Sequence, residues 1–376
     1  MDRTEYFLLE ILKQEVCQKS INKRLTVTLA ELGQIMRLAR EHTVQGIVAN
    51  AAVQGSIGLS VKKGGDKEIA VLELMKVNIM HQRNYLRFEN ALADFAKLME
   101  QYQIRYVVFK GVAVARHYQV SYTRTMGDVD FYVPASDFSR AVEVIERNLQ
   151  VKIEKEDIDK HFSFYYQSIR FEMHYQIETF GSGNHQRYFN RMIDRCIDNG
   201  LTYFCISGCT SNCRKSNIAV LPPNEDLMVV FKHWFNHLLV EGVGLRQTLD
   251  LAVLLKAYRD KLDIAELMIT LDRIGYLNAF RAMLAMMKKY FGLSWVDVFC
   301  LLNDSDRRYG DKLIATVLKS GNFGQKAYKH KAYGNRKSFE TALKALRHCL
   351  NFFKLAPWDI LCLVPKRIRI TLRVKI

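Results

Sequence analysis

Two aspartates in the run Gly127-Asp128-Val129-Asp130 are the residues of this chain whose types and spacing most directly indicate chemistry. Because side chains alternate along a strand, Asp128 and Asp130 are expected to share one face, with Val129 on the other. Adjacent carboxylates repel each other unless a cation lies between them, and Mg²⁺ prefers carboxylate and phosphate oxygens. The pair therefore indicates a metal site for phosphoryl transfer, although a solvent-facing acidic pair is the more frequent meaning of Asp-x-Asp alone.

Four neighbouring features strengthen the interpretation of the aspartate pair. Lys110 and Gly111 follow a predicted strand and precede a helix, a position where backbone N–H groups and a lysine can hold phosphates. Arg124 lies four residues before Asp128 and could supply a second cation. Glu172 could complete a three-carboxylate site, with His174 on the same strand face. Taken singly, Glu172 is better explained as a surface acid and His174 as a hydrogen-bonded core residue.

Together these motifs resemble the uncharacterised nucleotidyltransferases of the DNA-polymerase-β-like nucleotidyltransferase superfamily. The similarity covers roughly residues 75–290. Its specific part is the combination of Lys-Gly with Gly-Asp-x-Asp at this spacing. The residues that carry it are 109–113, Tyr118, Arg124, 127–133, 172–174 and the later helical segment 245–252.

The resemblance implies a transferase that moves a nucleoside monophosphate from an NTP to a hydroxyl acceptor, with Mg²⁺ or Mn²⁺ as cofactor and pyrophosphate as product. Two metals would act in phosphoryl transfer. The implied roles are catalysis and metal binding for Asp128, Asp130 and Glu172, nucleotide binding for Lys110, Gly111, Arg124 and Gly127, and contact with a substrate cleft for His174 and Arg246.

The chain departs from the superfamily pattern at two points. The superfamily usually has Gly-Ser after the first strand, whereas Val112 follows Gly111 here, so a serine contact to phosphate is absent. The third acid is Glu172, where aspartate is more usual. An alternative is therefore a catalytically inactive nucleotidyltransferase-like module that binds RNA or a protein partner.

Hydrophobic periodicity predicts an α+β fold in which a small mixed β-sheet is flanked by N-terminal and C-terminal helical regions. The resemblance implies that this sheet is the nucleotidyltransferase core. The predicted regions are an N-terminal helical region at 1–104, the core with the mixed sheet at 105–221, and a C-terminal helical region with a basic tail at 222–376. Helices are expected at 4–16, 29–53, 67–101, 112–118, 136–149, 227–240, 245–259, 264–274 and 278–290. Strands are expected at 106–109, 129–133, 162–167, 170–177 and 218–221.

The net charge of +16 is concentrated near the C-terminus. From residue 301 to 376 there are 17 Lys and Arg against 5 Asp and Glu, a net +12. This asymmetry favours an anionic partner such as RNA about as much as it favours a solvated basic face. We find neither a signal peptide nor an apolar run long enough for a transmembrane segment, and therefore expect a cytoplasmic protein.

Four secondary patterns are open to structural explanations. Cys205, Cys209 and Cys213 lack the paired spacing of zinc ribbons. His233, His237 and Glu241 recur every four residues on one predicted helix face. This pattern is more typical of packing histidines than of metal ligands. Arg246 and Asp250 have the spacing of an intrahelical ion pair. Residues 366–376 alternate with strand period and suggest an edge strand or an anionic-surface contact.

Overall fold

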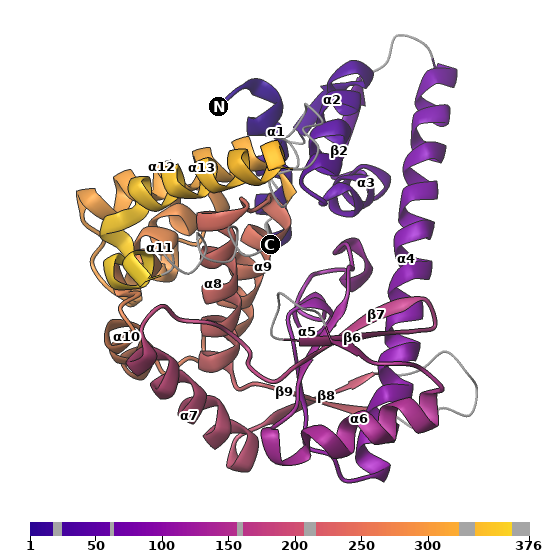
Figure 1. Cartoon of the computed structure of the whole chain (residues 1–376). Coiled ribbons are helices and arrows are strands. Elements are labelled where there is room, and N and C mark those ends of the chain that lie inside the picture. Colours follow the sequence, from indigo (N-terminus) through magenta and orange to yellow (C-terminus); the bar gives the residue numbers. More distant parts are fainter. Residues whose placement is uncertain (18–24, 61–63, 156–160, 207–215, 323–334, 363–376) are drawn as a thin grey trace. The chain divides into compact units, whose positions relative to one another are not determined.

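The structure is a computed structural model in which residues 1–17, 25–60, 64–155, 161–206, 216–322 and 335–362 are described. The chain forms two compact units (Figure 1). One, here called the helical unit, comprises Met1–Gln82, His117–Thr125 and Phe231–Ile376; the other, here called the sheet unit, comprises Arg83–Arg116 and Met126–Val230. Each unit is therefore assembled from segments that are distant in sequence.

A seven-stranded mixed sheet forms the centre of the sheet unit, in the order β5-β6-β7-β4-β3-β9-β8. Strand β4 pairs in parallel with β7, and β3 in parallel with β9, whereas the other neighbours are antiparallel. The strands are β3 Val107–Phe109, β4 Val129–Tyr132, β5 Glu154–Lys155, β6 His161–Tyr166, β7 Ile169–His174, β8 Thr202–Ile206 and β9 Ser216–Val220.

Alternation along the central strands gives the sheet one apolar and one polar face. Phe131 of β4 and Phe171 of β7 are fully buried and contact Phe95, with ring centroids 4.6 Å and 5.5 Å from it. The intervening residues Asp130 and Glu172 point to the opposite face. The apolar face thus fixes the strand register, because a slip of one residue would bury the acids in the core.

Besides the first part of α8 (Pro223–Val240), four helices of the described residues belong wholly or partly to the sheet unit. The C-terminal half of α4, from Phe88 to Met99, and the buried side of α6 pack on the apolar face of the sheet. The four helices are α4 Gly64–Gln101, α5 Gly111–Ala115, α6 Ala135–Leu149 and α7 Gly183–Asn199. In α6 the buried residues Ala141, Val144 and Ile145 recur at threes and fours, which explains its amphipathic pattern.

The helical unit contains most of the remaining helices and a parallel two-stranded sheet, β1 Leu25–Thr28 with β2 Ile57–Ser60. Its helices are α1 Arg3–Cys17, α2 Leu29–Glu41, α3 Gln45–Val53, the N-terminal half of α4, most of α8 Pro223–Val240, α9 Leu245–Tyr258, α10 Ile264–Arg273, α11 Leu277–Phe291, α12 Asp304–Ser320 and α13 Asn335–Phe352, with short 3₁₀ turns at Ser121–Thr123, Ser294–Val298 and Phe353–Leu355. No helix in the described ranges combines the length and apolar character needed to cross a membrane.

The mixed α+β architecture predicted from the sequence is confirmed, with two kinds of difference. The single helix expected at 29–53 is wrong: it is broken between α2 and α3, where Thr43 adopts a φ of 55°. Helix α7 and strands β1, β2, β5 and β8 were not predicted. The division into 1–104, 105–221 and 222–376 stays a prediction, and the strand expected at 366–376 lies outside the described residues.

Candidate metal and nucleotide site

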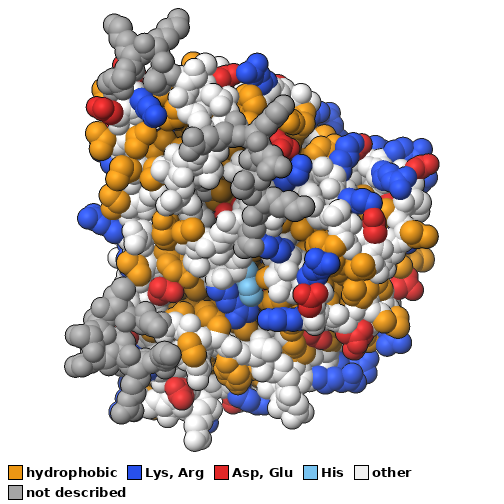
Figure 2. Space-filling view, turned by 180° about the vertical axis from the view of Figure 1, so that it is seen from behind, with side chains coloured by type: hydrophobic (Ala, Val, Ile, Leu, Met, Phe, Trp, Pro, Cys, Tyr) orange, Lys and Arg blue, Asp and Glu red, His pale blue; other side chains and the backbone are white. Residues whose placement is uncertain are grey.

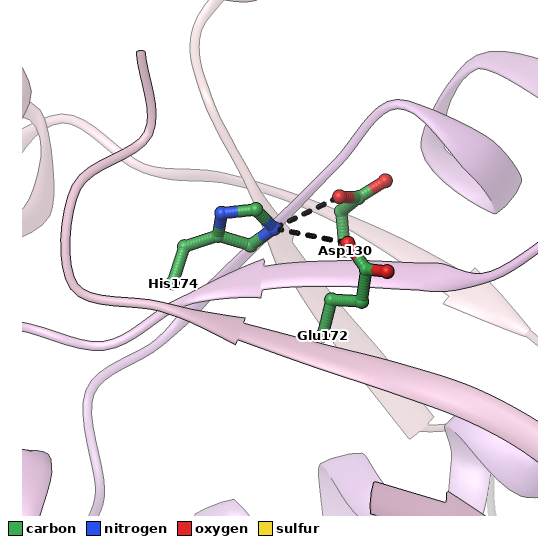
Figure 3. A group of neighbouring side chains, drawn as sticks. All are labelled: Asp130, Glu172 and His174. Atoms are coloured by element: carbon green, nitrogen blue, oxygen red, sulfur yellow. Dashed lines mark hydrogen bonds and ion pairs between the residues drawn. The ribbon is translucent and has the colours of Figure 1, made fainter. Parts of the chain in front are cut away.

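Three side chains on the polar face of the sheet converge to form a potential metal site. The parallel pairing of β4 with β7 places Asp130 beside Glu172 and Tyr132 beside His174. Asp130, Glu172 and His174 are all buried, and each offers a ligand atom within 4.8 Å of the others (Figure 3). The strand pairing thus brings Asp130 and His174 together, although they are 44 positions apart in the sequence.

The imidazole of His174 lies between the two carboxylates. Its Nε2 is 2.9 Å from Oδ1 of Asp130 and 3.8 Å from Oε2 of Glu172. The ring also packs edge-on against Phe109, with centroids 5.2 Å apart. His174 is therefore held in place by packing and hydrogen bonding. The sequence placed it on the same face as Glu172 but did not identify its contact with Asp130.

Lys110 and Gly111 form a tight turn between β3 and α5. Both have positive φ, 58° at Lys110 and 32° at Gly111. A left-handed conformation at a non-glycine residue costs about 1–3 kcal/mol and often marks a functional constraint. Lys110 Nζ lies 3.5 Å from Oδ1 of Asp130 and 4.9 Å from the centre of the Phe109 ring. The turn thus directs the lysine toward the acidic cluster.

Negative charge dominates the electrostatics of this cluster. The pKa of Glu172 is raised to about 8, first by burial and then by the charges of Asp130 and Asp128, although Arg170 and Lys110 act to lower it. Burial lowers the pKa of Lys110, but Asp130, Glu178, Asp128 and Glu172 outweigh burial and leave that pKa above its usual value. A bound cation would offset this excess of carboxylate charge.

Asp128 is half-buried just before β4 and is not one of the three converging residues. Its charge nevertheless acts on both Glu172 and Lys110. The preceding Gly127 is exposed. A Cβ atom on Gly111 would lie 3.1 Å from the backbone carbonyl oxygen of Asp128, so the Lys110-Gly111 turn passes close to the segment that carries the first aspartate.

Three further polar residues near the cluster were not identified from the sequence. The guanidinium of Arg170 contacts Oε1 of Glu172 at 3.1 Å, and Ser163 lies opposite Glu172 on β6. Arg170 precedes Glu172 by two positions, so the strand period could have found it. Glu178, which follows β7, is buried and acts on Lys110 through its charge. Its sequence context gives no comparable signal.

Arg124 belongs to the helical unit and forms a buried ion pair there. Its Nε and Nη2 each donate to one carboxylate oxygen of Asp250 at 2.8 Å. The Tyr118 hydroxyl donates to the same carboxylate at 2.7 Å. Asp250 thus binds Arg124 instead of Arg246, whose Nη1 donates to the Thr125 carbonyl oxygen at 3.1 Å. Contacts of Arg124 with a nucleotide and of Arg246 with a substrate stay predictions.

The structure gives little support to the other potential metal-binding patterns in the sequence. His237 Nδ1 lies 3.3 Å from Glu241, and the rings of His233 and His237 are 4.3 Å apart, but these residues are not among the metal-compatible groups in the described parts of the chain. Cys205 is exposed and its thiol contacts the side-chain oxygen of Asn217. Cys209 and Cys213 lie outside the described residues.

Comparison with known proteins identifies the family. The sequence matches the family described as "Uncharacterised nucleotidyltransferase" over residues 29–292, which is more than half of the chain. The chain belongs to this uncharacterised nucleotidyltransferase family. The matched range contains every member of the acidic cluster, Lys110, and the Arg124–Asp250 pair. No curated protein and no solved structure matches the chain. The resemblance inferred from the motifs is thus confirmed.

Proposed function

We propose that this nucleotidyltransferase transfers a nucleoside monophosphate from an NTP to a hydroxyl acceptor and releases pyrophosphate. The convergence of Asp130, Glu172 and His174 on one sheet face, beside the half-buried Lys110, carries the proposal. Family membership supports nucleotidyl transfer in general. The mixed sheet is, on this proposal, the nucleotidyltransferase core, within the predicted region 105–221.

The donor set suits a hard divalent cation such as Mg²⁺ or Mn²⁺. Carboxylate oxygens predominate, and the pKa of Glu172 is about 8 because burial and neighbouring carboxylates disfavour its ionised form. Asp130 and Glu172 would hold such ions, with His174 as a nitrogen donor and Asp128 as a further carboxylate. When bound, one or two divalent cations would neutralise phosphate charge and activate the acceptor hydroxyl.

The chain's own groups supply binding and orientation. Lys110, held 3.5 Å from Asp130, offsets the charge of the triphosphate. The backbone of the turn at Gly111 and the exposed Gly127 allow close approach of phosphate. An acceptor oxygen forms a bond to the α-phosphorus, the bond to the pyrophosphate oxygen breaks, and the hydroxyl proton passes to water.

The test is transfer of label from α-³²P-labelled NTPs to fractionated cell extract in the presence of Mg²⁺ or Mn²⁺. We expect Asp130→Asn and Glu172→Gln to reduce labelling roughly 10³-fold or more, because each removes a carboxylate from the converging group. Glu154→Gln is the matched control, since Glu154 is exposed on β5 of the same sheet and should leave transfer unchanged.

The identity of the labelled fraction would show whether the acceptor is a small molecule, RNA or a protein. Labelling that persists in both variants would contradict the proposed site. If the wild-type chain binds RNA in a salt-sensitive way but neither binds nor transfers nucleotide, it acts instead as an inactive nucleotidyltransferase-like module.

A further inference from the structure

The first half of helix α4 exposes an unusual concentration of large apolar side chains. Ile69, Leu72, Ile79 and Met80 are 64%, 58%, 46% and 68% exposed. Figure 2, turned by a half-turn from Figure 1, shows hydrophobic side chains along the left margin, where α4 then lies. Contiguous exposed apolar surface of this kind marks an interaction site more often than single exposed residues do.

The exposed residues follow the geometry of a helix-pairing face. Leu72, Met75 and Ile79 recur at intervals of three and four, so they form one stripe. Four residues before Leu72 is the exposed Glu68, and four residues after Ile79 is the exposed Arg83. The stripe therefore has an acidic end and a basic end, about 22 Å apart at 1.5 Å per residue.

We infer that this face of α4 is a homodimer interface in which the helices of two copies pair antiparallel. A two-fold axis that passes midway between positions 75 and 76 of the helix would place Leu72 of one copy opposite Ile79 of the other. The same axis would place Glu68 opposite Arg83 twice over. Parallel pairing would instead set Glu68 against Glu68 and Arg83 against Arg83, which is repulsive.

A groove beside the stripe adds apolar surface to the interface. Its apolar lining includes Leu32 and Met36 of α2 and Ile69 and Leu74 of α4, and the charged Arg40, Asp66 and Glu73 also line it. All of these residues belong to the helical unit. Side chains of the second helix that flank the central stripe can pack into this groove, so the dimer would bury more than the stripe alone.

Sedimentation equilibrium of the full chain, from low to high micromolar concentration, tests the inference. We expect a monomer–dimer equilibrium. Leu72→Glu combined with Ile79→Glu should raise its dissociation constant at least about 10²-fold, because each change places charge in an apolar contact. Leu301→Glu, at a residue 89% exposed in another part of the helical unit, is the control and should leave dimerisation unchanged.

Charge reversal tests the antiparallel arrangement. Glu68→Arg alone and Arg83→Glu alone should each weaken the dimer about tenfold, since each replaces two attractive contacts with two repulsive ones. The double variant should restore wild-type dimerisation. Far-UV circular dichroism of each variant checks that α4 remains helical. A wild-type chain that stays monomeric, or a dimer that neither the apolar nor the charge variants weaken, overturns the inference.

Discussion

Two charge clusters of this protein differ in their balance of charge. In the helical unit, one guanidinium and one carboxylate, Arg124 and Asp250, satisfy each other through two hydrogen bonds of 2.8 Å. In the sheet unit, Lys110 experiences the charges of four carboxylates, those of Asp128, Asp130, Glu172 and Glu178, and Arg170 contacts Glu172.

The balance of charge predicts a structural role for the first cluster and a functional role for the second. A buried ion pair with its hydrogen bonds complete holds segments together and needs no ligand. A buried group with more carboxylates than cations keeps one carboxyl pKa at about 8 and is stabilised by a bound cation. Removing one charge should therefore harm the first cluster through stability and the second through activity.

The largest expected effect comes from breaking the balanced pair. Asp250→Asn leaves the guanidinium of Arg124 buried without its counter-charge, and should lower the free energy of unfolding by about 3–5 kcal/mol. Urea titration followed by circular dichroism measures this loss of unfolding free energy. Glu172→Gln is the contrasting variant: it removes an ionisable carboxyl from the carboxylate-rich cluster, so its unfolding free energy should not fall. Equal losses in the two variants would refute the comparison.

A smaller effect is expected from removing the central cation of the sheet unit. Lys110→Met keeps the length of the side chain but removes its charge, and should lower kcat/KM for the NTP roughly 10²-fold. Steady-state kinetics with varied NTP would show it. Lys152→Met, on the loop before β5, should behave like wild type. Unchanged kinetics in Lys110→Met would remove this lysine from the nucleotide site.

Divalent cations should stabilise the unbalanced cluster alone. At about ten times its Kd, Mg²⁺ or Mn²⁺ should stabilise the wild-type fold by about 1.4 kcal/mol through preferential binding to the native state. Thermal unfolding with and without EDTA measures the change. The stabilisation should vanish in Glu172→Gln and persist in Tyr118→Phe. The assignment of the metal site fails if both variants respond like wild type.

The smallest effect concerns the third member of the balanced cluster. Tyr118→Phe removes one hydrogen bond to Asp250 but leaves both bonds from Arg124, so we expect a loss of only about 1 kcal/mol. Urea titration again provides the measurement, with Tyr6→Phe, at an exposed residue, as control. A loss as large as that of Asp250→Asn would mean that the hydroxyl, rather than the ion pair, dominates this cluster.

Much of the sheet unit could be predicted from its sequence because its strands are short, apolar and followed by clear turn residues. Strand β8 was missed because its burial does not alternate, so no strand period marks it. Helix α7 is largely polar and buries only Phe189, Ile193, Cys196 and Ile197. The break between α2 and α3 at Thr43 has no glycine or proline to signal it.

The candidate site was only partly accessible to the same reasoning. Residue types identified Asp130, Glu172 and His174 one by one, but their convergence depends on the parallel pairing of β4 with β7, and strand order is a long-range property. The partner of Arg124 was missed for a similar reason, since Asp250 lies 126 positions further along the chain. Local spacing instead favoured Arg246 as the partner of Asp250, because Arg246 is only four positions away in the sequence.

The close approach of Gly111 to the Asp128 carbonyl limits how this site can vary in evolution or by design. A side chain at position 111 would press on that carbonyl from 3.1 Å and would also have to adopt a φ of 32°. A larger residue there could be accommodated only if the backbone leading into β4 shifted as well. Positions 111 and 128 are therefore expected to change together or not at all, and attempts to graft the Gly-Ser form of the turn should redesign both segments.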